Sequence, residues 1–155
     1  MKKNVMLFCY CIICLVFIVG FFIQIRPVIT IVNNTGKVLY IYKTESVYGV
    51  EPEPYEVGEI VKSRPRILVA GKKFKLTTSF MSLLKKDAEI DVGWRVGGRY
   101  EYNSIGGGSQ GFILSSTEGV CSVSIEIQSG LNKNIIKTVA GNMCLKKIKA
   151  FNYKY

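Results

Sequence analysis

The stretch VCSVSIEI, residues 120–127, carries the clearest secondary-structure signal in the chain. Val123, Ile125 and Ile127 alternate with serine and glutamate at the positions between them. Successive side chains of a strand point to opposite faces, so this pattern predicts a strand with one buried and one solvated face. Cys121 shares the phase of the apolar residues and is expected to face the core.

Similar short stretches lie on both sides of that strand. Runs of β-branched and aromatic residues, separated by turn residues, occur at 28–32, 38–42, 66–70, 74–80, 90–96, 99–102 and 112–114. Short strands at this spacing, without alternating helices, predict a mainly-β domain that is an antiparallel β-sandwich or a small open barrel. Residues 81–86 are expected to form one helical turn or part of a long loop.

Two hairpins are expected among these strands. The turn-forming residues 33–36 should join strands 28–32 and 38–42. Gly97 and Gly98 supply the positive-φ positions of a two-residue turn between 90–96 and 99–102. The glycine-rich residues 106–111 match G-x-G-x-x-G literally, but an apolar strand-like stretch follows them instead of a helix. We therefore expect a flexible loop there and no nucleotide site.

The N-terminal region has a different character from the rest of the chain. Residues 1–4 form a short basic head, and no residue from Asn4 to Ile25 is charged. As a helix, Val5–Ile25 would extend about 31 Å, which matches a hydrocarbon core of about 30 Å. We predict a single transmembrane helix over residues 5–25, acting as an uncleaved signal anchor for a domain at 26–155. A cleaved signal peptide is disfavoured because no small-x-small site surrounds Gly20.

The cysteines indicate the redox compartment in which the domain lies. The domain contains two, Cys121 and Cys144, and a disulfide between them would stabilise it by about 3 kcal/mol in the chain-entropy model. A disulfide and the signal-like N terminus both favour an oxidising compartment. We therefore expect a single-pass protein of the cytoplasmic (inner) membrane with its C-terminal domain in the periplasm or extracellular space. The N-terminal cysteines are expected to act as small hydrophobic residues.

An acidic segment occupies residues 45–59. Pro52 and Pro54 oppose strand pairing there, and no lysine or arginine interrupts the segment. We expect an exposed acidic loop that binds a partner through Glu45, Glu51, Glu53, Glu56 and Glu59.

The chain as a whole is basic, with a formal net charge of +10. Residues 131–155 carry lysines without an acidic residue and could form an edge strand, on which lysine prevents unwanted pairing. Such a surface attracts acidic proteins, anionic lipid headgroups or an anionic polymer. Nucleic acid is not expected outside the cytoplasm. The predicted basic patch consists of Lys133, Lys137, Lys146, Lys147 and Lys149.

The sequence offers little support for an enzyme. Histidine is absent, which removes the commonest general base and many metal ligand sets. Ser82 and Lys85 form an S-x-x-K motif without the companion motifs of that chemistry. Glu89 and Asp91 should share one face of a strand as solvated charges. No catalytic residue, metal or cofactor is expected.

Together these features predict a membrane-anchored, non-catalytic binding module of the cell envelope. The most concrete form is an immunity-type protein that neutralises a periplasm-acting effector, with a protein as its partner. One alternative is an accessory subunit of an envelope or secretion assembly. An alternative of a different class is a small envelope hydrolase that uses Ser82 and Lys85, or Glu89 and Asp91.

Overall fold

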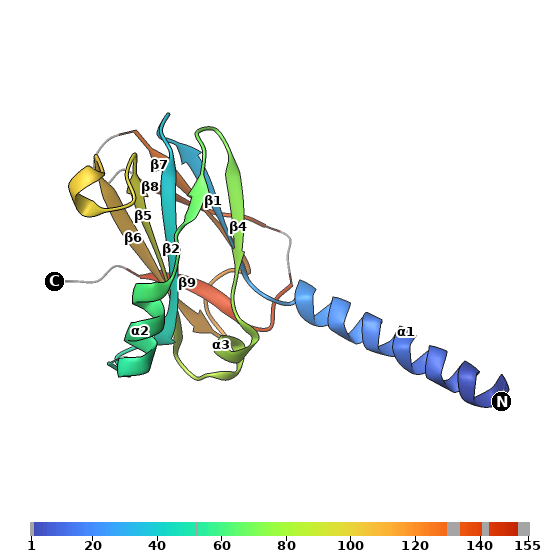
Figure 1. Ribbon diagram of the computed structural model, residues 1–155. Coiled ribbons are helices and arrows are strands. Elements are labelled where there is room, and N and C mark those ends of the chain that lie inside the picture. The colour runs from blue at the N-terminus through green and yellow to red at the C-terminus, as the bar shows by residue number, and fades with distance from the viewer. Residues whose placement is uncertain (1, 52, 130–133, 141–142, 152–155) are drawn as a thin grey trace.

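The computed structural model describes residues 2–51, 53–129, 134–140 and 143–151, with backbone alone at 2–5, 19, 21–24, 56 and 59–61. A long N-terminal helix leads into a β-sandwich (Figure 1). The elements are α1 (Lys2–Gln24), β1 (Val28–Asn34), β2 (Leu39–Val47), α2 (Pro54–Lys62), β3 (Arg66–Leu68), β4 (Lys73–Thr77), α3 (Phe80–Leu84), β5 (Ala88–Val96), η1 (Glu101–Asn103), β6 (Gly107–Ser115), β7 (Ser122–Gln128), β8 (Asn134–Thr138) and β9 (Lys147–Phe151).

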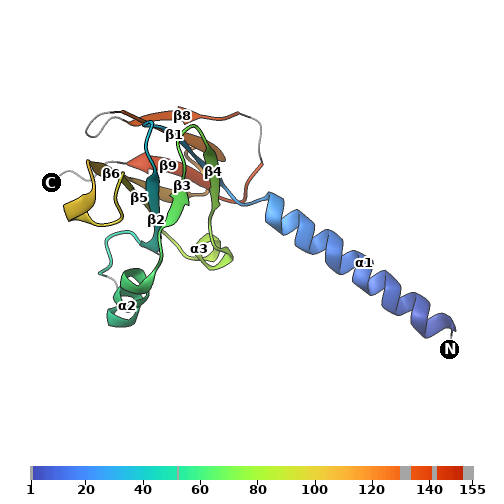
Figure 2. The ribbon, with the colours of Figure 1, turned by 45° about the horizontal axis from the view of Figure 1, so that its top comes forward.

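Two sheets make up the domain. One has the strand order β4-β1-β7-β8 and the other the order β3-β2-β5-β6-β9. Figure 2 shows them as two layers, with β8 and β1 in one and β5, β6 and β9 in the other. Fully buried residues from both layers, among them Ile31, Ile125, Ile90 and Phe112, form one core. The mainly-β prediction is confirmed, and Val123, Ile125 and Ile127 face the core as expected.

One strand pair departs from the antiparallel prediction. β1 pairs with β7 in parallel, in a register that runs from Val28 opposite Ser122 to Asn34 opposite Gln128. The other strand pairs are antiparallel among the residues that the structure describes. A parallel pair requires a long crossover connection. Here the crossover runs from β2 to β6 in the sequence, and it includes every strand of the five-stranded sheet except β9.

The hairpin predicted between strands 28–32 and 38–42 is wrong. Both strands exist, but β1 and β2 belong to different sheets. Asn33 explains the change of direction, because its buried side-chain amide donates to the carbonyls of Lys37 at 2.7 Å and Leu68 at 2.9 Å. Its Oδ1 accepts from the backbone N–H of Thr35 at 3.0 Å. These bonds form an Asx-type turn that carries the chain from one layer to the other.

The second predicted hairpin has a longer connection. β5 pairs with β6, and the segment between them contains η1 instead of a strand at 99–102. The glycine-rich segment is therefore largely a strand and not a flexible loop. The indole of Trp94 requires glycine opposite it, since a Cβ on Gly108 would lie 2.9 Å from Cζ2 of that ring. The ring of Phe151 covers Gly111 in the same way.

The N-terminal helix is present as α1, and it projects away from the domain (Figures 1 and 2). Every side chain described from Met6 to Ile18 is exposed. Within the part of the chain that the structure describes, no helix is long and apolar enough to cross a membrane, so the predicted transmembrane span is unsupported.

The predicted disulfide is confirmed. Cys121 and Cys144 are bonded, with their Cα atoms 5.5 Å apart. The bond lies where α1 joins the domain: the carbonyl of Cys121 accepts from Val28 N at 2.9 Å, and the N–H of Leu145 donates to the carbonyl of Ile25 at 2.8 Å. The disulfide therefore links the segment before β7 to the C-terminal segment, and both segments are hydrogen-bonded to the first residues of the domain. Cys121 itself is half-buried and precedes β7.

Candidate functional site

The acidic residues at 45–59 do not form one loop. Glu45 lies within β2, because β5 is long enough to pair with that strand as far as Val47 opposite Ala88. Glu51 and Glu53 are exposed just before α2. Glu56 and Glu59 are positions of α2, and their side chains lie outside the described residues. The expected loop is thus a strand end, a short connection and a helix.

Glu45 is engaged inside the domain. Its carboxylate pairs with the Lys43 ammonium and accepts hydrogen bonds from the Ser79 backbone N–H, at 2.9 Å, and from the Ser82 hydroxyl. Burial raises the pKa of this carboxyl, but these hydrogen bonds and the lysine charge together hold it below its ordinary value. The role of Glu45 is therefore to fasten the start of α3 to β2.

The predicted basic residues are divided between the two sheets. Lys137 lies on β8 and pairs with Glu126 at 2.7 Å. Lys146 donates to the carbonyl of Lys85 at 2.5 Å, just before β9. Lys149, on β9, pairs with Glu118 at 2.5 Å. Lys147 also belongs to β9, an edge strand of the five-stranded sheet as expected. Lys133 lies outside the described residues.

Among the described residues, those of the hydrolase alternative line neither of the two concave surfaces described below. Ser82 is buried, and its hydroxyl donates to Glu45, whereas Lys85 is exposed at the C-cap of α3. The Ser82 hydroxyl is therefore bonded to a carboxylate instead of a lysine amine. Among the described residues no group of histidine, cysteine, aspartate and glutamate could hold a metal ion.

The carboxylates of β5 differ from the solvated charges expected there. Glu89 is only 5 % exposed and Asp91 is half-buried, with Oδ1 buried and without a hydrogen-bond partner among the described residues. The Phe151 ring lies over Gly111, the register partner of Asp91, and shields this part of the sheet. Burial, followed by the nearby charge of Glu89, raises the pKa of Asp91 to about 6. This pair does not line either of the two concave surfaces described below.

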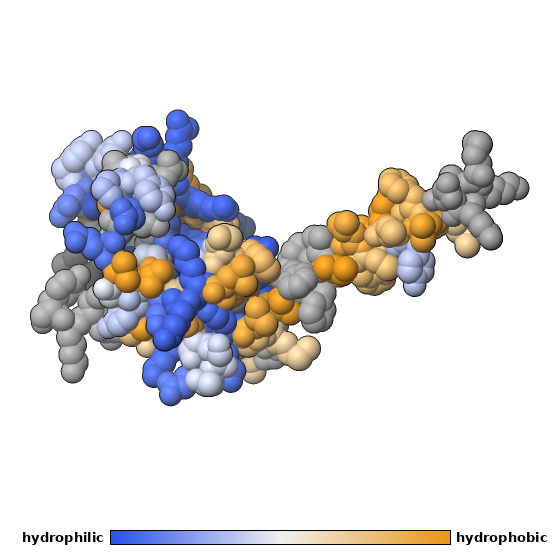
Figure 3. Space-filling view, turned by 90° about the horizontal axis from the view of Figure 1, so that it is seen from below, coloured by the Kyte–Doolittle hydropathy of each residue, from blue (hydrophilic) through white to orange (hydrophobic). Residues whose placement is uncertain are grey.

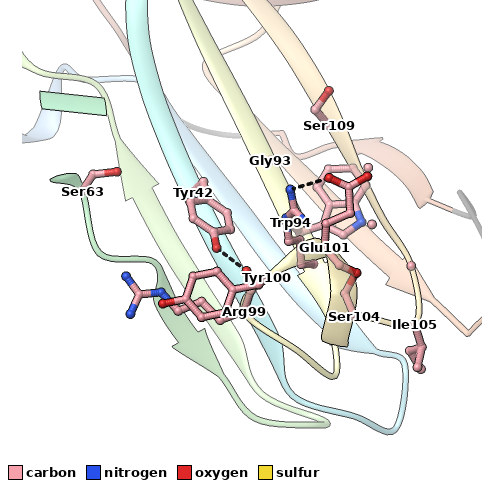
Figure 4. Close-up of a pocket in the computed structure, with 14 residues that line it drawn as sticks. Tyr42, Ser63, Gly93, Trp94, Arg99, Tyr100, Glu101, Ser104, Ile105 and Ser109 are labelled. Atoms are coloured by element: carbon pink, nitrogen blue, oxygen red, sulfur yellow. Dashed lines mark hydrogen bonds and ion pairs between the residues drawn. The ribbon is translucent and has the colours of Figure 1, made fainter. Parts of the chain in front are cut away.

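A groove of about 1010 Å³ lies on the outer face of the five-stranded sheet, beside the segment that joins β5 to β6 (Figure 4). Tyr42 and Gly93 belong to its floor, together with Ser109 of β6. The β5–β6 segment contributes Arg99 and Tyr100 to its wall. Gly93 and Gly107 have no side chain on this face of the sheet, so the larger side chains around them surround a depression.

Aromatic and arginine side chains organise the groove. The hydroxyl of Tyr42 donates to the carbonyl of Arg99 at 2.7 Å, which ties the β5–β6 segment to β2. The Arg99 guanidinium lies 5.3 Å from the centre of the Tyr100 ring. Arg95 pairs with Glu101 at 3.7 Å, a longer separation than in the Lys137–Glu126 pair. The Glu101 side chain is 93 % exposed, so this ion pair is weak.

This site is not evident from the sequence, because the pattern of residues 90–102 predicts a hairpin in which the arginines and tyrosines are strand residues. One sequence feature could have indicated the site: Arg95, Arg99, Tyr100 and Tyr102 lie close together in one short segment. Arginine and tyrosine are enriched in binding surfaces. Scans of the chain against models of known protein families and against curated proteins find no match.

Proposed function

We propose that this chain is a membrane-attached, non-catalytic binding module of the cell envelope, and that the groove beside the β5–β6 segment receives its protein partner. The groove carries the proposal. It is concave, it combines tyrosine rings with two arginines, and the segment that forms its wall is fastened to the sheet through Tyr42. Rigid aromatic and arginine side chains bind partners at a low cost in conformational entropy.

The chemistry of the groove favours an acidic segment as the bound part of the partner. Arg95 has a long ion pair with a carboxylate that is almost fully exposed. A carboxylate of the partner can replace Glu101 without leaving a buried charge unpaired, because Glu101 returns to water. Arg99 offers a second planar guanidinium for a bidentate bond. Complementary charge would also accelerate association.

Attachment to a membrane is supported by apolar surface. The exposed side chains of α1 are apolar around the helix, and Figure 3 shows further apolar residues on the domain near the point where α1 leaves it. Met81 and Leu84 of α3 and Leu145 are each more than half exposed. The disulfide favours an oxidising compartment, so we place the domain on the outer side of the cytoplasmic membrane.

The most concrete form of this function is an immunity-type protein that neutralises an effector at the membrane. The exposed Glu51 and Glu53 remain a second candidate surface, suited to a basic effector site. The accessory-subunit alternative is favoured by one observation: Ile135 and Ile136 of the edge strand β8 are 46 % and 37 % exposed, on opposite faces. Such an edge can accept a further strand.

A pull-down with the tagged, detergent-solubilised full-length protein under non-reducing conditions tests the proposal. We expect one specific partner, lost in R95E/R99E and retained in the control E51K/E53K/E56K. Loss in the control alone would move the interface to the acidic segment. Retention in both, combined with loss in I135K, would favour pairing at β8. Absence of any partner would refute the binding function.

Attachment is tested separately by fractionation. The full-length chain should remain with membranes in alkaline carbonate, and externally added protease should digest the domain in intact spheroplasts. Release by carbonate would refute integral attachment, and protection from protease would refute the outward orientation.

A further inference from the structure

A second concave surface is strongly basic. This cleft, of about 510 Å³, lies between β2, β4 and the segment that precedes β3. Tyr42 and Ser63 line both the cleft and the groove, so the two surfaces adjoin. The cations that line the cleft are Arg26, Lys43, Arg64, Arg66 and Lys75.

Few of these charges are neutralised within the domain. Lys43 pairs with Glu45, and Arg66 lies 4.9 Å from the centre of the Phe74 ring. Within the described part of the chain, Arg26, Arg64 and Lys75 have no ion-pair partner. Bringing like charges together around one cleft costs free energy, and a bound anion would offset that cost.

Two buried polar atoms of the cleft residues lack partners. Thr78 is 2 % exposed, and its Oγ1 has no hydrogen-bond partner among the described residues. Nε of Arg26 is also buried without one, and Nη1 of the same guanidinium makes only a long bond of 3.4 Å to the carbonyl of Thr78. Buried donors are normally satisfied, so these atoms point to a ligand that accepts hydrogen bonds.

We propose that this cleft binds a phosphate group. A phosphate has several acceptor oxygens and accepts bidentate bonds from guanidinium groups, which suits a site with three arginines better than a single carboxylate does. In this site the buried Thr78 hydroxyl and the half-buried Arg26 would be the inner partners of the phosphate, and the exposed Arg64, Arg66 and Lys75 its outer partners. This site goes beyond the proposed function, which depends on the neighbouring groove.

Two sources offer this chemistry, a phospholipid headgroup and a soluble phosphate. Arg26 comes two residues after the end of α1, which would keep the cleft near a membrane surface if α1 attaches the chain to one. The experiment therefore uses both probes on the full-length protein, which is first titrated with inorganic phosphate by calorimetry in a maltoside detergent at low ionic strength. The protein is then placed in nanodiscs of phosphatidylcholine with or without phosphatidylglycerol, and hydrogen exchange is measured at residues 73–79.

Saturable binding of phosphate that is weakened about tenfold or more in R64Q/R66Q, and unchanged in K72Q/K73Q, would support a soluble ligand. Thr78→Val is the sharper variant, because removing an unsatisfied buried hydroxyl should leave folding unchanged or slightly improved while weakening the phosphate affinity. Protection of residues 73–79 by phosphatidylglycerol alone, lost in the same variants, would support the lipid. Absence of both effects, or equal loss in K72Q/K73Q, would overturn the proposal without bearing on the groove.

Discussion

The Tyr42 hydroxyl donates a 2.7 Å hydrogen bond to the carbonyl of Arg99, a residue 57 positions later in the chain. This bond holds the wall of the groove against its floor. Tyr42→Phe should lower the free energy of unfolding by about 1 kcal/mol, the usual net contribution of such a bond. It should also accelerate amide exchange in the β5–β6 segment, measured by mass spectrometry.

Tyr40 provides the matched control, because it lies two positions earlier on the same face of β2. Its hydroxyl has no hydrogen bond among the described residues. Tyr40→Phe should therefore leave both the exchange rates and the urea midpoint nearly unchanged. Equal effects of the two substitutions would show that the bond does not hold the segment.

Glu45→Gln should destabilise the domain in a pH-dependent way. The folded pKa of Glu45 lies below its ordinary value of 4.5, so the ionised carboxylate adds stability at neutral pH, and that stability is lost as the pH falls through the folded pKa. We expect a loss of about 1–3 kcal/mol at pH 7, since three donors lose a charged acceptor. Urea unfolding of variant and wild type should converge in acid, once the pH is below the folded pKa of Glu45. The exposed Glu51→Gln should show no difference at either pH.

Asp91→Asn should stabilise the domain at neutral pH, whereas Glu45→Gln should destabilise it. The folded pKa of Asp91 is about 6, above its ordinary value of 3.8, so the folded state binds this proton more tightly than the unfolded state. Ionisation therefore destabilises the domain as the pH rises between these values. Allowing for partial solvent screening, the variant should be more stable than wild type by about 1 kcal/mol at pH 7.5. The difference should vanish near pH 4, and a constant difference at all pH values would contradict this account.

Removal of the disulfide by C121A/C144A should lower stability by about 3 kcal/mol, as expected for a link between residues 23 positions apart. Thermal unfolding of the wild type with and without reductant measures the same contribution. The reduced wild type should match the variant. A reduced protein as stable as the oxidised one would mean that the bond constrains little.

Gly108→Ala should destabilise the domain by about 1–3 kcal/mol, because the new Cβ would lie 2.9 Å from Cζ2 of the buried Trp94 ring. Gly93→Ala is the control on the neighbouring strand, since its Cβ would meet the nearest atoms at 3.8 and 3.9 Å. Calorimetric melting should separate the two variants clearly. Similar melting temperatures would show that the indole can move aside.

The local pattern of apolar and polar residues was sufficient to predict most of the strands and the buried face of β7. Alternation is a property of neighbouring residues, so Val123 and Ile125 reveal their burial without tertiary information. The pairing of strands, in contrast, depends on residues that are far apart in the sequence. The turn at Asn33 depends on a bond to Leu68, which lies 35 positions away, and no short-range pattern distinguishes that turn from a hairpin.

The same limit explains the candidate site. The glycines at 107, 108 and 111 predict a flexible segment, whereas packing against Trp94 and Phe151 requires glycine within a strand at these positions. The acidic residues from Glu45 onward predict a loop, because the sequence alone does not reveal that β5 pairs with the strand that contains Glu45. Arg95 and Arg99 could be counted in the sequence, but the depression between them and Tyr42 exists only once β2, β5 and β6 are adjacent.

The parallel pairing of β1 with β7 determines when the domain can fold during synthesis. β1 is the first strand to be made, yet its partner Ser122 follows Val28 by 94 positions. Until β7 has emerged, β1 has only the edge strand β4 beside it, so a central strand of one sheet stays unpaired on one side. Contacts of such large sequence separation make folding slow, and the domain must complete its core after nearly all of its chain is available.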